Sequence, residues 1–487
     1  MTTDCMSEVD RLFKTVVDGG YCIGCGACAS VEHSPIQMKL DGYGRFVATV
    51  DSLTQDPTNY IPVQEVCPFS EQALNEDQIS SQLFAKHCRH HNKIGYHLAT
   101  YAGYVVEGEF RDRGSSGGMG TWIVSKLLNE NLIDGVLHVQ QRQPTKTDPR
   151  LFEYQLSSTL EQVQNGSKSR YYPVELSQVM QFVKERPGRY AIVGIPCFIK
   201  AVRLLMKQDS LLAERISFCV GLICGHLKSI HFAEMFAWQC GIEPGNLLGI
   251  NFRKKLLGRS SNSYGVEAIG IHDKQIISQV QVVQDLFGHD WGLGFFKYKA
   301  CDYCDDVVAE TADIVIGDAW LPQYINDSQG SNVIVVRHPL IHQFIEDGIT
   351  EEKLRLDRID ANEIAKSQTS GLTHRREGLA YRLHLADQQG AWHPPKRVKP
   401  SAARFNSNFQ KRHFMRMKLV EESHMAFQEA RLSGNFSVFI SRMEPLIQKY
   451  QMLYRKPLWR KFAGYFKHFI LTNIKLLSST FTSSCNN

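Results

Sequence analysis

Four cysteines near the N-terminus constrain this chain more than any other feature of its sequence. Cys22, Cys25 and Cys28 lie in the run Cys-Ile-Gly-Cys-Gly-Ala-Cys, and Cys67 follows later, directly before Pro68. Three thiolates at intervals of three residues can wrap one corner of an iron–sulfur cubane, and a distant Cys-Pro can supply the fourth ligand. The glycines between them let backbone amides approach the sulfides. Because zinc sites usually present two separated Cys-x-x-Cys pairs, this spacing favours a 4Fe–4S cluster.

The length and composition are those of a multidomain globular protein. The 487 residues predict two to four domains, and 43% hydrophobic with 22% charged residues is ordinary for a soluble protein. The N-terminus has neither a basic start nor an apolar stretch, so we expect no export signal. No run approaches the roughly 20 apolar residues of a membrane-spanning helix. Thirteen cysteines, several in Cys-x-x-Cys patterns, favour metal ligation in a reducing compartment, the cytoplasm.

The predicted fold class is α+β or α/β, with a small ferredoxin-like N-terminal module, a mixed α/β core and a helical C-terminal extension. Short apolar strands alternate with amphipathic helices in the core. We expect strands over 101–106, 190–195 and 313–316, and helices over 120–129 and 198–206. Asp41-Gly42 predicts a hairpin over 37–50, and the His-rich stretch 86–92 is typical of a linker. The predicted units are 1–78, 95–180, 181–340, 341–400 and 401–487.

The C-terminal unit is strongly basic. From Ser401 onward the chain has 14 Lys and Arg against 4 Asp and Glu, although the whole chain carries a net charge of only +5. Near the end, Trp459, Phe462 and Phe466 recur at helical spacing among cations such as Arg460 and Lys467. Such a helix can lie on an anionic membrane surface, dock on a partner, or pack on its own core or another subunit. These alternatives stay open; nucleic-acid binding is disfavoured because the cations alternate with aromatic residues.

A second set of cysteines is scattered along the core. Cys197 follows a predicted strand in Gly-Ile-Pro-Cys, at the start of a helix that would favour its thiolate. Cys301 and Cys304 form Cys-Asp-Tyr-Cys, and Cys224 lies in Gly-Leu-Ile-Cys-Gly, five residues after Cys219. One Cys-x-x-Cys with two remote cysteines can hold a second cluster, a zinc ion or nothing, and the spacing alone does not choose.

Two glycine-containing segments are candidate anion sites. Gly114-Ser-Ser-Gly-Gly precedes an apolar helix, where free amides can hold a phosphate, although such a turn can also serve tight packing. Gly166-Ser-Lys offers a hydroxyl and a cation, and an alternative interpretation is a solvated loop.

Taken in order, these segments resemble the coenzyme F(420) hydrogenase/dehydrogenase beta-subunit family of iron–sulfur flavoproteins. The resemblance covers about 15–335 and includes Thr-Ala-Asp-Ile-Val-Ile-Gly-Asp at 311–318; chlorophyll-pathway reductases are similar relatives. It implies FAD held by the first glycine-rich turn and neighbouring loops: Gly114, Ser115, Ser116, Gly117, Gly118, Gly166, Ser167 and Lys168. It also implies a second 4Fe–4S cluster on Cys197, Cys224, Cys301 and Cys304, with Cys224 preferred to Cys219 because its flanking residues match better.

The chain departs from the family pattern after its first three cysteines. Many members continue at once with Val-Cys-Pro and a further ferredoxin-type set, whereas this chain reads Val31-Glu32-His33 and has only Cys67-Pro68. We therefore expect one cluster in the N-terminal module and two in the whole chain.

These parts predict an oxidoreductase that passes electrons between 4Fe–4S clusters and FAD. Its substrate is unidentified and can be a deazaflavin-like cofactor; the sequence names no catalytic residue. A redox partner protein, such as a ferredoxin or an oxidoreductase subunit, is expected, and a homo-oligomer is compatible with the sequence. Two alternatives are an electron-transfer subunit without its own substrate and a zinc-stabilised binding or scaffold protein.

Overall fold

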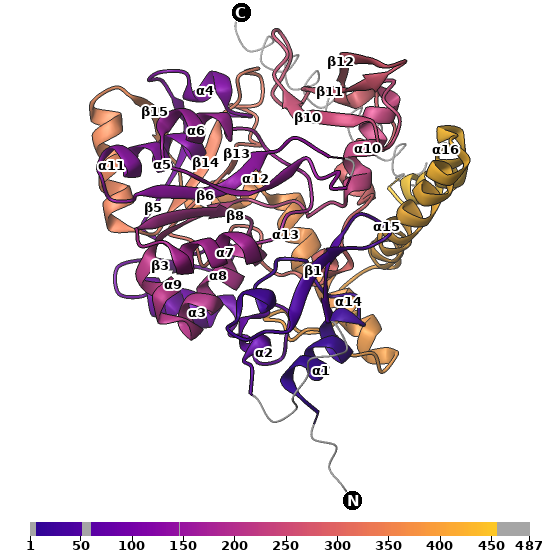
Figure 1. Ribbon diagram of the computed structural model, residues 1–487, viewed down its shortest axis with the longest axis horizontal. Coiled ribbons are helices and arrows are strands. Elements are labelled where there is room, and N and C mark those ends of the chain that lie inside the picture. The colour runs from indigo at the N-terminus through magenta and orange to yellow at the C-terminus, as the bar shows by residue number, and fades with distance from the viewer. Residues whose placement is uncertain (1–5, 51–59, 146, 455–487) are drawn as a thin grey trace, which may run out of the picture.

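An eight-stranded mixed sheet forms the centre of the molecule (Figure 1). The computed structural model describes residues 6–50, 60–145 and 147–454. The strand order is β15-β5-β14-β13-β9-β8-β6-β7. The strands are β5 (Ala99–Val105), β6 (Gly135–Gln141), β7 (Phe152–Ser157), β8 (Tyr190–Gly194), β9 (Ile216–Leu222), β13 (Ile314–Asp318), β14 (Asn332–Val336) and β15 (Leu354–Arg358).

Four neighbouring strands of this sheet run parallel. β13 pairs with β9, β9 with β8, and β8 with β6, with registers such as Val315↔Gly221 and Gly194↔Gly221. Antiparallel strands complete both edges. The carboxyl ends of the parallel strands meet at one edge of the sheet, where open α/β sheets commonly bind ligands.

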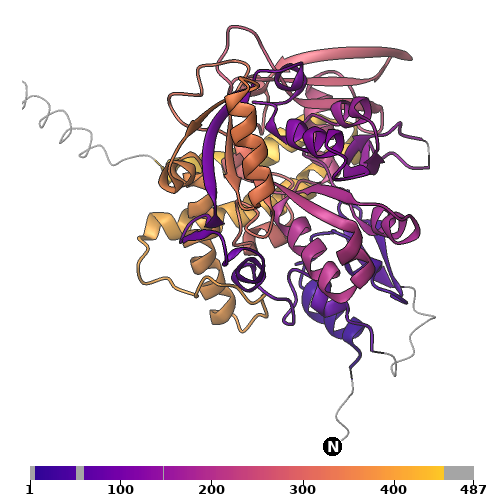
Figure 2. The same ribbon diagram turned by 90° about the vertical axis from the view of Figure 1, so that its left-hand side faces the viewer.

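Helices cover both faces of the sheet because its strands are apolar on both sides. Helices α5 (Met119–Asn129) and α11 (Pro339–Thr350) pack on the face that carries Tyr101 and Ile334. Figure 2 shows α11 lying against the sheet. The opposite face, with Ala102 and Val333, packs against α7 (Ser177–Glu185), α8 (Pro196–Gln208) and α9 (Ser210–Arg215). The helices α4 (Phe110–Arg113) and α6 (Leu160–Asn165) are short.

The N-terminal module packs beneath the sheet in Figure 1. It begins with α1 (Glu8–Leu12) and a π-helical turn (Phe13–Val17), and a 3-10 turn follows at Cys28–Ser30. The predicted hairpin is confirmed as β1 (Ile36–Leu40) with β2 (Phe46–Val50), and Asp41 Oδ1 accepts hydrogen bonds from two amides of the turn. The module continues with α2 (Val63–Val66) and α3 (Glu76–Phe84).

A smaller antiparallel sheet stands at the upper right of Figure 1. It contains β10 (Leu247–Lys254), β11 (Gly265–His272) and β12 (Gln275–Val282), and α10 (Ile230–Gln239) packs against β10 and β11. Three 3-10 turns connect it back to the large sheet, at Val283–Asp285, Trp291–Leu293 and Lys299–Tyr303.

The C-terminal region is helical, as predicted. It contains α12 (Ala361–Ser367), α13 (Thr369–Arg375), α14 (Glu377–Gln388), α15 (Ser407–Ser433) and α16 (Phe436–Met452). α15 and α16 form a hairpin whose bend uses Gly434 at φ 63° and Asn435 as the N-cap of α16. The aromatic, basic stretch from Trp459 to Ile470 lies outside the described residues.

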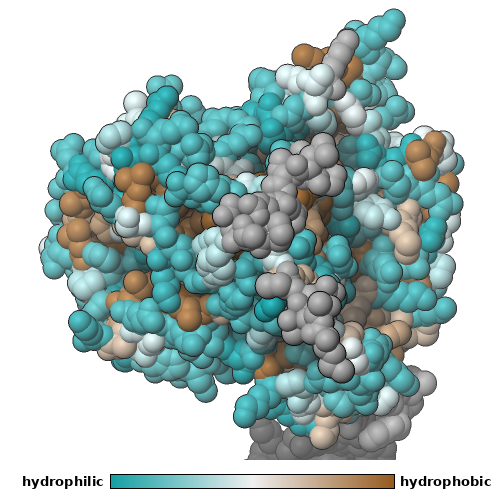
Figure 3. Space-filling model, turned by 60° about the horizontal axis from the view of Figure 1, so that its bottom comes forward, coloured by the Kyte–Doolittle hydropathy of each residue, from teal (hydrophilic) through white to brown (hydrophobic). Residues whose placement is uncertain are grey.

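The predicted fold class is confirmed, and one local prediction is wrong. Residues 86–92 are not a linker throughout, because β3 (Arg89–His91) pairs with β4 (Gly95–His97). The other predicted strands and helices form within a few residues of their expected bounds. No helix among the described residues is long and apolar enough to span a membrane. The face in Figure 3 is mainly hydrophilic, with small, separate apolar patches.

Candidate functional site

The four N-terminal cysteines gather inside the module. Cys25 and Cys28 are buried, and Cys22 and Cys67 are partly so. Burial raises the pKa of the Cys28 thiol well above its usual range, and the neighbouring thiols of Cys22, Cys25 and Cys67 raise it further. The side chains are therefore close enough to act on one another, as ligands of one cluster must be.

Backbone amides face these sulfur atoms. Burial raises the pKa of Cys22, and hydrogen bonds from the amides of Ala48 and Gly24 lower it. Gly24 has φ +70°, and an added Cβ would lie 2.4 Å from the carbonyl oxygen of Phe46. Glycine is therefore required for this close approach. Amides directed at sulfur stabilise the thiolates that an iron–sulfur cluster needs.

The second cysteine set forms at the carboxyl ends of two parallel strands. Cys197 follows β8 at the start of α8, and Cys224 follows the adjacent β9. The 3-10 turn Lys299–Tyr303 brings Cys301 and Cys304 to the same place, and all four cysteines line one small cavity. Burial raises the pKa of Cys224 to about 11 and that of Cys301 to about 12. The amide of Leu227 donates a 3.4 Å hydrogen bond to Cys301 Sγ.

Cys219 does not line this cavity. It is buried on β9, where its amide donates a 2.7 Å hydrogen bond to Asp313 Oδ2. Burial raises its pKa to about 12, and the nearby Arg203 lowers it. This placement favours Cys224 as the candidate ligand.

The two cysteine sets can be compared with the geometry that a single metal ion requires. Tetrahedral zinc holds sulfur at about 2.3 Å, which requires the sulfurs to be about 4 Å apart. Among the described residues, no three His, Cys, Asp or Glu side chains converge closely enough to hold one ion. The four cysteines of the second set surround one small shared cavity.

The predicted glycine-rich turn and the Gly-Ser-Lys loop lie together. The amide of Ser169 donates to Ser115 Oγ at 2.9 Å, Ser167 Oγ donates to the Arg113 carbonyl at 3.0 Å, and Lys168 Nζ donates to the Gly114 carbonyl at 3.3 Å. The turn leads into α5, whose N-cap Gly118 has φ +87° and no side chain; the first amide of the helix, that of Met119, donates to Asn332 Oδ1 at 3.1 Å. Helix N-termini of this kind attract anions.

These segments border a cavity of about 570 Å³, within the roughly 300–1,000 Å³ of small-molecule sites. Of the predicted FAD-binding residues, Gly114, Ser115, Ser116, Gly118 and Ser167 line it. Gly117, Gly166 and Lys168 do not line the cavity. An added Cβ on Gly117 would lie 2.7 Å from Asn332 Oδ1, and one on Gly166 would lie 2.3 Å from the His138 ring, so both glycines serve packing. Lys168 instead supports the turn.

The three candidate sites adjoin one another. Ile195, Cys224 and Leu227 line both the cysteine cavity and the large cavity. On the other side, Ile23 and Phe69 of the N-terminal module line the cysteine cavity. Cys25 of the first set lies near enough to Cys197 of the second to raise its pKa. Electron carriers bound at these three sites would therefore lie next to one another in a row.

Sequence comparisons bear on the kind of protein that has this site. The profiles of the N-terminal and C-terminal parts of the coenzyme F(420) hydrogenase/dehydrogenase beta subunit match residues 100–181 and 188–362, just over half of the chain. The chain belongs to this family. The resemblance to this family that the sequence indicated is confirmed. A redox role is confirmed with it, because these beta subunits are parts of oxidoreductases.

Two individual proteins resemble this family member more weakly. An uncharacterized protein of Methanocaldococcus jannaschii is 20% identical over 358 residues, which cover 68% of this chain and 88% of that protein. A chain of the F(420)-reducing NiFe hydrogenase complex from Methanosarcina barkeri, solved after xenon derivatization, is 14% identical. The alignment covers 61% of this chain and 96% of that one, with a TM-score of 0.45.

The structure places Arg375 beside the second cysteine set, which the sequence did not predict. It lies on α13, beyond the matched residues, and is fully buried beside the second cysteine set. It donates hydrogen bonds of 2.5 and 2.6 Å to the carbonyls of Cys224 and Gly225. Its charge lowers the pKa of Cys304 and of Cys224, against the larger effect of burial. No local motif marks such an arginine.

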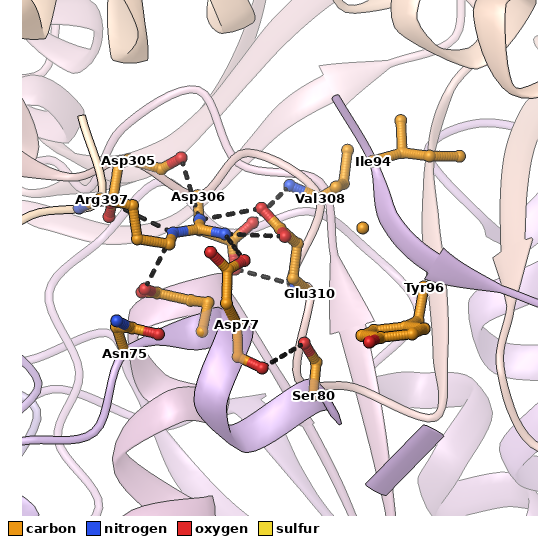
Figure 4. A network of polar contacts seen from close by, with 12 residues as sticks. Asn75, Asp77, Ser80, Ile94, Tyr96, Asp305, Asp306, Val308, Glu310 and Arg397 are labelled. Carbon is orange, nitrogen blue, oxygen red and sulfur yellow. Dashed lines mark hydrogen bonds and ion pairs between the residues drawn. The ribbon is translucent and has the colours of Figure 1, made fainter. Parts of the chain in front are cut away.

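A buried ion network joins the second cysteine set to the N-terminal module (Figure 4). Arg397 donates to both carboxylate oxygens of Glu310 at 2.9 Å and to Asp77 of α3 at 2.7 Å. It also contacts Asp305 Oδ2 at 3.3 Å, directly after Cys304. One arginine from the C-terminal region therefore fixes the loop of Cys304 against α3.

Proposed function

We propose that this chain is an iron–sulfur flavoprotein oxidoreductase that holds two 4Fe–4S clusters and FAD in a row. The observation that carries the proposal is the shared wall: Cys224 borders both the four-cysteine cavity and the 570 Å³ cavity beside the glycine-rich turn. Two cavities that share a wall place the groups they hold side by side.

The residues fit the proposed groups. Cys22, Cys25, Cys28 and Cys67 would hold one cluster, and Cys197, Cys224, Cys301 and Cys304 the other. FAD would lie in the large cavity, at the N-terminus of α5. When bound, the clusters supply one-electron transfer, and the flavin connects it with two-electron hydride chemistry.

The chain itself would position and insulate these groups. The turn at Gly114–Gly118 suits a diphosphate, and Lys168 and Lys255 place positive charge behind the turn without lining the cavity. Lys255 Nζ donates to the Ser116 carbonyl at 3.1 Å and so supports the same turn. Between the cavities, Ile195 and Leu227 present apolar side chains that exclude water.

A second candidate function is an electron-transfer subunit that has no substrate of its own. The family description favours it, because the family is one of beta subunits. Such a protein would co-purify with a partner oxidoreductase and would show no turnover alone. We also propose three points that the structure does not address: a deazaflavin-like cofactor as the substrate, a homo-oligomer, and membrane contact by the basic tail.

The test is anaerobic purification of the full chain with chemical quantification. We expect about eight irons, about eight sulfides and about one FAD per chain, with broad absorbance near 400 nm. A colourless protein that contains zinc and no flavin would overturn the proposal and would favour the zinc-stabilised scaffold.

A further inference from the structure

The large cavity has one wall that the proposed cofactors do not explain. His226, His374 of α13 and Arg416 of α15 line it. Each has a buried nitrogen with no hydrogen-bond partner: His226 Nδ1, His374 Nδ1 and Arg416 Nε. His226 and His374 are 8% and 4% exposed. Buried polar groups are normally paired, and Arg170 Nε and Arg253 Nε of the same cavity are also unpaired, so the polar lining of this cavity indicates a missing ligand.

A ligand of this wall must accept a hydrogen bond from the Arg416 guanidinium. Among the described residues, no carboxylate forms an ion pair with Arg416. The nearby carboxylate of Asp302 is already shared by Lys297 at 2.7 Å, His374 Nε2 at 3.2 Å and Arg382 at 3.7 Å. Lys228 is fully buried nearby, over the ring of Trp291; burial lowers its pKa well below the usual range, and its Nζ donates to the Phe295 carbonyl at 2.7 Å.

The guanidinium of Arg416 is the fixed charge of this wall, because burial holds the pKa values of His226 and His374 well below their usual range and favours neutral imidazoles. A buried charge without a partner is unfavourable. Asp318, a carboxylate that does line the cavity, forms an ion pair with Arg253. Burial and the guanidinium groups of Arg382 and Arg416 hold the pKa of His374 well below its usual range, which places these groups close together.

The two proposed cofactors have other cations beside them. Arg375 faces the second cysteine set, and Arg416 does not line that cavity. The proposed diphosphate site has Lys168 and Lys255 around the glycine-rich turn. His374 and Arg416 also lie beyond residue 362, where the family match ends. Two of the three residues of this wall therefore lie beyond the matched part of the chain.

We propose that His226, His374 and Arg416 form a subsite for an oxyanion group of the substrate, a carboxylate or a phosphate, in the cavity that the proposed function assigns to FAD. The planar guanidinium of Arg416 suits both oxyanions, because its donors match two oxygens of either group. His226 also stacks on Trp291, with ring centres 5.0 Å apart, so its ring is held in place. This inference rests on the proposed function and names the class of substrate that it takes.

The test is isothermal calorimetry of the purified full chain with inorganic phosphate and, separately, with acetate, at constant ionic strength set by chloride. We expect one of the two anions to bind saturably, with one site per chain, and the better binder identifies the source of the group. Arg416→Gln should weaken that binding by about tenfold or more, since a charge-assisted hydrogen bond is lost. Arg416→Lys should recover part of it.

The matched control is Arg412→Gln on the same helix. Arg412 stacks on Tyr454 and donates to the Leu453 carbonyl, away from the cavity wall, so its loss should leave anion binding unchanged. Absence of saturable binding, or equal binding by Arg416→Gln and the parent, overturns the inference. Loss of FAD from Arg416→Gln also overturns it, because Arg416 would then hold the cofactor. If the parent protein itself purifies without FAD, that result contradicts the proposed function and not the anion subsite. Calorimetry then still measures whether the anion binds.

Discussion

The Arg375 guanidinium sets the charge beside the second cysteine set. It is fully buried and bonded to the carbonyls of Cys224 and Gly225, and it lines the same cavity as the four thiols. Reduction adds negative charge to an iron–sulfur cluster, so a fixed positive charge nearby favours the reduced state.

We therefore predict that Arg375→Gln lowers the reduction potential of the second cluster. The expected shift is on the order of 60 mV, which corresponds to tenfold in a one-electron equilibrium. Redox titration followed by electron paramagnetic resonance measures it. Arg375→Lys, which keeps the charge, is the control. An unchanged potential in an Arg375→Gln protein with full iron content would refute the assigned role.

A second prediction concerns the pH dependence of FAD binding. Burial, with the repulsion of Lys168 and Arg111, lowers the pKa of Lys255 to about 7 in the protein without ligand. A bound diphosphate would favour the charged lysine, so binding takes up a proton above pH 7, and affinity falls as the pH rises. Fluorescence titration of the apoprotein with FAD between pH 6.5 and 9 measures this. The slope should be smaller in Lys255→Met; an equal slope in that variant would contradict the assignment.

The start of α5 shows how an element depends on its terminal glycines. Gly118 has φ +87°, and an added Cβ would lie 2.7 Å from the amide nitrogen of Arg111. Gly120, two residues later in the first turn, has open space around the same position. The two glycines are therefore a matched pair in one turn.

We expect Gly118→Ala to lower the free energy of unfolding by about 1–3 kcal/mol, because alanine strains this backbone conformation. Gly120→Ala should be neutral or slightly stabilising, since alanine is the better helix former. Chemical denaturation of the apoproteins measures both. Equal stability of the two variants would show that the turn tolerates a side chain and does not need its left-handed glycine.

Arg397 connects elements that are far apart in the chain. Its side chain joins Asp77 of α3 to Asp305 and Glu310, which follow the last cysteine of the second set (Figure 4). Asp305 and Glu310 are almost fully buried. Removing the arginine would leave both carboxylates without their main partner.

We predict that Arg397→Gln destabilises the protein by about 3–5 kcal/mol, as expected when a buried ion pair loses one partner. Arg189→Gln is the control, because Arg189 pairs with Asp134 at the exposed surface. That variant should unfold at the parent's midpoint. Urea denaturation compares the two, and a similar small effect from both would mean that the buried network contributes little to stability.

At the scale of the whole molecule, the features that could be predicted from the sequence are those marked by a local pattern of residues. The spacing of Cys22, Cys25 and Cys28 and the strand–Cys197–helix pattern are local, and the resemblance supplied the grouping of the second set. Arg375, Arg397 and Arg416 could not be predicted, because only the tertiary fold brings them to their places; Arg375, for example, contacts Cys224 from 151 residues away and Arg397 contacts Asp305 from 92 residues away. The hairpin at Arg89–His91 was missed because polar, His-rich strands carry no apolar alternation.

The central claim is that two separate cysteine sets hold one cluster each. Iron quantification in anaerobically purified Cys22→Ser and Cys304→Ser, made separately, tests it most directly. Each variant should retain about half of the parent's roughly eight irons. If both variants retain the same iron per chain as the parent, the two-cluster account is wrong.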